Sequence, residues 1–565
     1  MATLTKNLFW GQGERDHRLA VIEGAWPTDV VGSVYVVGPN AISPGGHWFG
    51  SHGIVLKLDL VPSASGHLSV TLRSVQTRVK RLRDRVPMLF RKFQFIEFSP
   101  MGVTNMANTN VQSLNGRMFL GYDAGRPIEI DPQSLKVISP VGSNGEWLQN
   151  SPGLLEPLCA VAAHPASDVA EGVMYFVNYS QVELPGVSAE TYVARWDCEG
   201  SVQRWRVRGM SAFDSIHDIK TTRHHLVFTD LPFKVEPGLF QGKPREERNQ
   251  SHTNLWIVPK EALRSTPEMG EVEAVEVQIP MPTGHVYADY EEVDGKLRVI
   301  LQQIPLGDLM ITMTRDSVDH RNSALIDPNY EGLIALALQP SVLGVYTIDP
   351  VSGEVEQSDL IMDSARVWGG VLPATDMFSE AGRASQTQAW YGGVGFDPDL
   401  VPQQWWDLYQ GATDGIVAPD ELPSTAVPGT LARFDLENLK VAEVFEYTNG
   451  SFPSPPTFVP RVGSTEANDG YVVVIVHQDG PKEIQIFDAA NVGVGPVARA
   501  TSADFNPNLM LHSWWMDPAT APKKVNYKVS VWADLRGALA GLPGVIASYF
   551  KMGRAMAGEL KASRR

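Results

Sequence analysis

The sequence of 565 residues contains thirteen histidines, the residue type in it that best suits metal binding. Four of them stand at the end of an expected strand or in the loop beside one, in segments far apart along the chain. They are His164, His217, His285 and His512. Four dispersed imidazoles indicate one iron or another first-row metal at the centre of a closed β-structure.

Spacing alone does not single out these four. His224 and His225 are neighbours in an expected strand, so their side chains point to opposite faces and cannot both reach one ion. His47 and His52 lie in a glycine-rich loop and remain candidate ligands on spacing. A lone histidine at a strand end is more often a hydrogen-bonded structural residue than a ligand, and this interpretation is applied to His17, His67, His252, His320 and His477.

Short strands are expected to position the histidines. Apolar or alternating runs bounded by turn residues predict strands, and 50 glycines and 40 prolines spread along the chain supply the turns. Helical periodicity is confined to a few places, chiefly the C-terminus. The expected strands are 32–40, 53–60, 117–122, 173–177, 255–258, 297–301 and 471–476.

Four segments share one plan, in which a strand ends in Asp, a tight turn follows, and an apolar residue enters the next strand. The aspartates are Asp131, Asp349, Asp435 and Asp488. Dispersed hairpins of one design favour an all-β fold built as a single β-propeller, with a β-sandwich as the alternative. No Gly/Ser linker divides the chain, so 1–565 is expected to form one domain, with a basic apolar extension at about 538–565.

Composition excludes several classes of protein. A hydrophobic fraction of 43% and a mean hydropathy of −0.12 are typical of a soluble protein with a large core. Two cysteines, Cys159 and Cys198, exclude a disulfide framework and a cysteine-rich zinc site. The first ten residues lack the order of a signal peptide, and no run of about 18 apolar residues occurs, so we expect a cytoplasmic protein.

The net charge of −17 conceals two basic segments. Residues 73–92 contain eight Lys/Arg and one acid, and 523–565 contain nine Lys/Arg and two acids. Without a broader basic face, no nucleic-acid partner is expected. Within them, 85–96 and 539–556 combine cations with large apolar residues, which suits peripheral contact with a membrane. The alternative is core-packing or lid elements whose charges are solvated.

Across most of its length the sequence resembles the carotenoid cleavage oxygenases, a non-haem iron family that also contains stilbene-cleaving enzymes. Residues 32–40 resemble the family's opening strand and Gly-Pro-Asn turn, and 108–109 and 457–461 resemble further signatures. Four segments resemble its ligand motifs in the family's order. These are Ala163-His164-Pro165, the run from Ile216-His217-Asp218 to Asp230, His285 with Tyr290-Glu291-Glu292, and His512 before Trp515.

The resemblance implies a seven-bladed β-propeller with a few helices and long loops capping one face. It implies Fe(II) held by His164, His217, His285 and His512, with open positions for O2 and substrate. The activity would be a dioxygenase that cleaves a carbon–carbon double bond of a carotenoid, apocarotenoid or similar apolar polyene into two carbonyl products. The alternatives are cleavage of a stilbene or phenylpropanoid, and a degenerate propeller that only binds an apolar ligand.

The sequence departs from the family where three glutamates orient the ligating histidines. Asp123 stands in the stretch expected for the first, and could serve if the backbone lies closer to its histidine. No glutamate is in register for the second, around Gly370 to Pro373. Pro455 takes the place of the third. These changes bear on the strength of metal binding more than on the fold.

Overall fold

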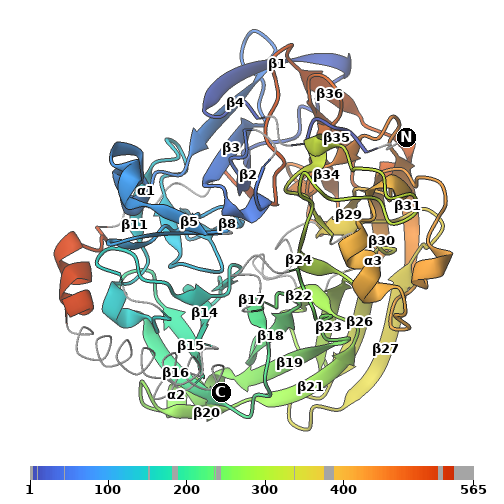
Figure 1. The fold of residues 1–565 in the computed structure, drawn as a ribbon. Helices are drawn as coiled ribbons and strands as arrows, with labels where there is room; N and C mark the ends of the chain where they lie inside the picture. Colours follow the sequence, from blue (N-terminus) through green and yellow to red (C-terminus); the bar gives the residue numbers. More distant parts are fainter. Residues whose placement is uncertain are drawn as a thin grey trace, which may run out of the picture.

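The computed structural model describes residues 4–8, 11–42, 45–93, 95–150, 153–180, 189–234, 236, 244–335, 338–373, 387–518 and 526–539. Most of these residues form β-sheets arranged around a common centre (Figure 1). The helices are few and short, namely α1 (Arg78–Arg85), α2 (Lys260–Ser265), α3 (Gln403–Tyr409) and a helix at 531–539. The expectation of a mostly β fold with few helices is confirmed.

Five sheets follow one another along the chain, and nearly all their strand pairs are antiparallel. The first sheet contains β8 (Asn110–Leu114), β9 (Arg117–Gly121), β10 (Ile128–Ile130) and β11 (Val137–Pro140), and the second contains β12 (Ala160–Val161), β14 (Val173–Ser180), β15 (Glu190–Trp196), β16 (Gln203–Arg208) and β20 (Glu271–Glu273), with β13 (Ala166–Asp168) on β14. The third contains β17 (Ser215–Thr221), β18 (His225–Leu231), β19 (His252–Pro259) and β21 (Val275–Pro280), and the fourth contains β22 (Thr283–Ala288), β23 (Leu297–Gln303), β26 (Val342–Ile348) and β27 (Val355–Met362). The fifth contains β28 (Gly370–Pro373), β29 (Gln388–Gly393), β30 (Thr430–Asp435) and β31 (Lys440–Glu446).

A ten-stranded sheet joins the two ends of the described chain. Its strands are β32 (Phe452–Pro453), β34 (Gly470–His477), β35 (Glu483–Asp488), β36 (Ala498–Thr501), β1 (Arg15–Gly24), β4 (His67–Ser74), β3 (Gly53–Asp59), β2 (Ser33–Pro39) and β37 (His512–Met516), with β33 (Thr457–Pro460) on β34. Early strands pair twice with late ones, because β1 pairs with β36 and β2 with β37. Closure of the ring of sheets therefore depends on contacts between distant parts of the sequence.

Two small sheets complete the described β-structure beside the cavity described below. They are β5 (Arg91–Phe93), β6 (Ile96–Ser99) and β7 (Gly102–Val103), and β24 (Asp308–Thr312) with β25 (Ile334–Ala335).

The hydrophobic core is divided among the interfaces between neighbouring sheets. One cluster, for example, joins Val227 and Ile257 of the β17–β21 sheet to Val299 and Tyr346 of the β22–β27 sheet. Corresponding clusters fill the other interfaces, including one between the two halves of the ten-stranded sheet. Each sheet is thus stabilised by burying apolar side chains against its neighbours on both faces.

The four predicted hairpins lie in four different sheets, as β10–β11, β26–β27, β30–β31 and β35–β36. In each the aspartate carboxylate accepts backbone N–H groups of the turn, as Asp349 does from Val351 and Ser352 at 2.8 and 2.9 Å. This local bond explains why Asp recurs there. The sequence analysis missed a fifth example, in which Asp197 accepts from Glu199 and Gly200 between β15 and β16.

No helix within the described ranges is long and apolar enough to span a membrane. Of the predicted basic apolar segments, 85–96 follows the end of α1 and includes β5 and the start of β6. Segment 539–556 lies outside the described residues except for Leu539, which is exposed. The same holds for most of the predicted extension at 538–565.

Candidate metal centre

The structure brings His164, His217, His285 and His512 together at one point. One ring nitrogen of each lies within 4.8 Å of those of the others. The rings meet mostly edge to face, with centroid distances of 4.6 Å for His164–His217 and 4.3 Å for His164–His512. Four imidazoles so placed offer one nitrogen each to a single first-row metal ion.

Irregular backbone at the innermost strands directs these side chains to the centre. The pairing register shifts between Ile216 and Asp218 in β17, and between Thr283 and His285 in β22. Such bulges re-aim a side chain that regular alternation would point elsewhere. The loop bearing His164 is pinned to β17, because His164 N–H donates to the His217 carbonyl and Ile219 N–H to the His164 carbonyl, both at 3.1 Å.

Asp123 orients His217. Its carboxylate accepts a hydrogen bond from His217 Nδ1 at 2.8 Å, so Nδ1 carries the proton and Nε2 remains available to a metal. The backbone near Asp123 lies close to the loop that carries His164, since a Cβ on Gly121 would stand 1.8 Å from the Ala163 carbonyl. Burial by itself would lower the pKa of His217, but the Asp123 carboxylate raises that pKa above its usual value.

His285 has a carboxylate partner that sequence reasoning missed. Asp218 Oδ2 lies 3.3 Å from His285 Nδ1, and Asp218 Oδ1 lies 3.0 Å from Lys220 Nζ. The only sequence signal is an Asp directly after a candidate ligand. Regular strand alternation would place it on the opposite face from His217, and the bulge shows why that inference fails here.

The backbone at Gly370 excludes the family glutamate in the region where it was sought. A Cβ on Gly370 would lie 2.0 Å from a ring carbon of Tyr391 and 2.2 Å from Ser341 Oγ. The Gly370 carbonyl accepts hydrogen bonds from Gln302 Nε2 and Tyr391 Oη, each at 2.9 Å. In this chain Asp218 is a carboxylate that lies beside His285.

The third expected glutamate position contains polar groups of another kind. Ser454, which precedes Pro455, accepts a hydrogen bond from Ile475 N–H at 2.9 Å through its hydroxyl. Two residues beyond Pro455, Thr457 Oγ1 lies 2.7 Å from Oγ of Ser513, the neighbour of His512. Hydroxyl pairing thus tethers β33 to the strand that bears His512.

The remaining candidate histidines serve other contacts. Buried His47 has its Nε2 3.3 Å from the Leu309 carbonyl, and burial lowers its pKa to about 4. His52 lies 3.7 Å from Glu97. His225 Nδ1 lies 2.9 Å from Glu292, whereas Glu291 accepts a hydrogen bond from Arg223. None of these belongs to the cluster at the centre.

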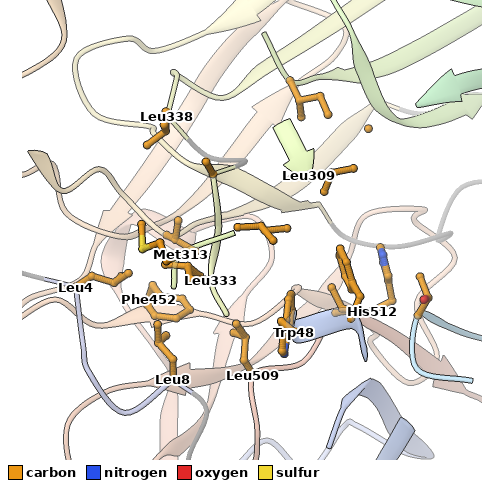
Figure 2. A pocket seen from close by; sticks show the side chains of 18 of the residues that line it. Leu4, Leu8, Trp48, Leu309, Met313, Leu333, Leu338, Phe452, Leu509 and His512 are labelled. Atoms are coloured by element: carbon orange, nitrogen blue, oxygen red, sulfur yellow. The ribbon is translucent and has the colours of Figure 1, made fainter. Parts of the chain in front are cut away.

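The histidines open onto a large apolar cavity of about 1100 Å³. His217, His285, His512 and Asp123 line it together with many aliphatic and aromatic side chains. Figure 2 shows Trp48, Leu309, Met313, Leu333, Leu338, Phe452 and Leu509 around the space on one side of His512. A cavity of this volume with a mostly apolar lining suits an apolar small molecule.

Comparison with known proteins places this fold and site in one family. The family profile of RPE65, described as retinal pigment epithelial membrane protein, matches residues 10–517. The chain belongs to this family, the carotenoid cleavage oxygenases, which are non-haem iron enzymes that cleave carbon–carbon double bonds. The resemblance found in the sequence is thereby confirmed.

Three matches, two of them to the same relative, illustrate the similarity. The apocarotenoid-15,15'-oxygenase of Synechocystis is 21% identical over 527 residues, which cover 89% of this chain and 94% of the relative. The structure of Pseudomonas brassicacearum lignostilbene dioxygenase superposes with a TM-score of 0.60 at 18% identity, covering 90% of this chain and 97% of that one. Cobalt-substituted Synechocystis apocarotenoid oxygenase gives 0.60 at 18%, covering 91% and 98%.

Proposed function

We propose that this protein is an Fe(II)-dependent dioxygenase that cleaves one double bond of a carotenoid, apocarotenoid or similar apolar polyene. The observation that carries the proposal is the opening of the four-histidine cluster into a long apolar cavity. The alkene and O2 together supply all atoms of two carbonyl products, so no further reductant is needed.

The donor set fits ferrous iron. Burial lowers the pKa of His164 and of His285, which favours the neutral imidazoles that ligate metals. Asp123 and Asp218 contact Nδ1 of two rings and so direct their Nε2 atoms to a common point. We therefore assign His164, His217, His285 and His512 as the ligands and Asp123 as an orienting residue. When bound, iron would supply the reactivity toward O2.

The protein's own contribution is positioning and exclusion of water. An apolar polyene gains about 25 cal/mol for each Å² of apolar surface that it buries, which holds it along the cavity without polar anchors. The walls on one side of His512 include Trp48, Leu509, Phe452 and Met313, which are apolar, while Lys6, Asp397 and Asp479 also line the cavity. The apolar residues near His512 favour a hydrocarbon chain beside the histidines.

We further propose that the fold is a seven-bladed propeller formed by one domain. The ten-stranded sheet divides into two units where β36 meets β1, and with the five other sheets these make seven. Seven hydrophobic clusters join these units pairwise into a closed cycle. The closed cycle supports a propeller over an open sandwich.

Peripheral contact with a membrane is proposed for the surface around α1 and the 531–539 helix. Arg78 pairs with Asp534 at 2.8 Å, which brings the two predicted basic regions together. Apolar side chains are exposed in both, with Met88 75% and Trp532 71% accessible. Phe95 and Ile96, which follow Met88, line the cavity. This proximity suits the uptake of an apolar substrate from a bilayer.

The first test is metal content after purification without oxygen. We expect about one iron per chain in the wild type and less than a tenth of that in His217→Ala. His47→Ala is the matched control, because it removes a buried histidine outside the cluster, and it should retain iron. Iron-loaded wild type should then convert an apocarotenal to two carbonyl products only when O2 is present.

Two results would contradict the proposal. Wild type that takes up no iron, even when Fe(II) is supplied, would indicate a degenerate propeller that only binds its apolar ligand. If iron-loaded protein cleaves a stilbene but no polyene, the substrate class is that of the stilbenes and phenylpropanoids instead.

A further inference from the structure

Residues near the start of the chain line the part of the cavity around Trp48, Phe452 and Leu509, here called the apolar arm. Figure 2 shows Leu4 on the far side of the pocket from His512, with Leu8 below Phe452. Leu8 packs in one hydrophobic cluster with Trp48, Phe452 and Leu509, and Leu4 packs against the same cluster. The segment 4–8, here called the N-terminal strap, thus supplies part of the cavity wall.

The strap presents alternate side chains to the cavity. Leu4, Lys6 and Leu8 line it, whereas Thr5 and Asn7 bind the surrounding loops. Leu8 is only 1% exposed. The two leucines are therefore the part of the strap that an apolar molecule in the arm would meet.

Hydrogen bonds fix the strap independently of its leucine side chains. Thr5 N–H donates to the Gly450 carbonyl at 2.9 Å, and Thr5 Oγ1 donates to Asp479 at 2.7 Å. On the other side Tyr330 Oη donates to the Leu4 carbonyl at 2.6 Å. Because these anchors use backbone atoms and Thr5, substitution of a leucine changes the wall while the strap stays tethered.

Polar groups lie at the strap itself. Leu4 N–H donates to the Asp397 carboxylate at 3.1 Å, and both Asp397 and Asp479 line the cavity here. A hydrocarbon terminus that passed Leu4 and Leu8 would meet these carboxylates, and desolvating them is unfavourable. The strap therefore separates the apolar arm from an acidic rim.

We propose that the N-terminal strap is the end wall of the apolar arm and determines how long a polyene the enzyme accepts. The inference rests on the proposed polyene-cleaving function and specifies its substrate as a linear conjugated chain with a hydrocarbon terminus. The double bond that is cleaved is then fixed by the distance from that terminus, which rests against Leu4 and Leu8, to the histidines.

The test compares polyenes of different length with variants that move the wall in opposite directions. Iron-loaded protein without oxygen is titrated with retinal and two longer apocarotenals, and Kd is measured by quenching of tryptophan fluorescence. In Leu8→Ala the ratio of Kd for the longest to the shortest ligand should fall about tenfold. In Leu4→Trp, which lengthens the wall inward, the same ratio should rise about tenfold.

Leu158→Ala is the matched control, because Leu158 lines the same cavity outside the strap. It should change Kd for all lengths alike and leave the ratio within about twofold. Thermal melting checks that each variant folds, and Leu4→Ala replaces Leu8→Ala if the latter does not, since Leu4 is only partly buried. Opposite shifts from Ala and Trp cannot arise from destabilisation alone.

The inference and the proposed function fail in different ways. If the ratio of Kd values is unchanged in both strap variants, or shifts equally in Leu158→Ala, the strap is not the end wall of the arm. The proposed dioxygenase function would be unaffected by that result. Wild type that binds none of the three polyenes would overturn both.

Discussion

At the scale of single residues, the distinctive feature is that aspartates, Asp123 and Asp218, contact two of the clustered histidines. Asp123 already reaches His217, so a glutamate at this position would be one methylene too long. We expect Asp123→Glu to weaken Co(II) binding about tenfold and Asp123→Asn, which removes the charge, by about 10–100-fold. Competition with a chelator, followed by the visible spectrum of bound Co(II), measures both. Tighter Co(II) binding in Asp123→Glu would contradict this expectation, because it would show that the longer side chain orients His217 better than Asp123 does.

Asp218 makes a second residue-scale prediction. It contacts His285 and also pairs with buried Lys220, so its loss removes an ion-pair partner from a buried cation. Asp218→Asn should weaken Co(II) binding about tenfold and lower the Tm. The double variant Asp218→Asn/Lys220→Met should recover the Tm but not the affinity. Recovery of both would mean that Asp218 serves only to neutralise Lys220.

At the scale of elements, the site depends on how closely β9 approaches the loop that carries His164. Gly121 ends β9, and a Cβ there would collide with the Ala163 carbonyl. Gly121→Ala should push Asp123 away from His217, reducing Co(II) affinity about tenfold while Co(II) still binds. Gly411→Ala is the control, because a Cβ at Gly411 meets open space, and its affinity should equal that of the wild type. Equal affinity in both variants would contradict the role of this close approach.

The elements also show what sequence could predict. The Asp-turn hairpins were readable because each depends on a local bond between a carboxylate and its own turn. The four histidines were identified from ordered motifs, and the structure brings them together. Asp218 was missed because its contact requires a bulge at His217, and alternation is the only local rule available for that strand. The strap was missed because a leucine in a short loop-like segment carries no signal of what lies across a cavity.

At the scale of the whole molecule, early strands pair with late ones in one sheet, and the core is shared among the interfaces between sheets. Six of the interfaces join sheets or half-sheets that follow one another along the chain. The β1–β36 and β2–β37 pairs join residues more than 450 apart, and no local rule predicts them. The stability of this closing sheet is therefore the global property that most needs measurement.

Lys482, which precedes β35 in the closing sheet, offers that measurement. It is buried, donates to the Pro507 carbonyl, and burial lowers its pKa from 10.5 to about 7. Between pH 7 and 10.5 the unfolded chain binds the proton that the folded state releases, so stability rises with pH in this window. Below pH 7 both states bind the proton, and the unfavourable contribution of the buried ammonium group reaches its full value of roughly 5 kcal/mol.

Lys482→Met should therefore raise the Tm by roughly 3 °C at pH 6, less the loss of the bond to Pro507, and the gain should shrink toward pH 10. Lys440→Met, at an exposed position in β31, is the control and should change the Tm little at either pH. Differential scanning calorimetry at one scan rate compares the three proteins. A gain that is the same at pH 6 and pH 10 would mean that Lys482 stays charged when the sheet is closed, and that the Pro507 carbonyl and its surroundings solvate the ammonium group well enough to offset its burial.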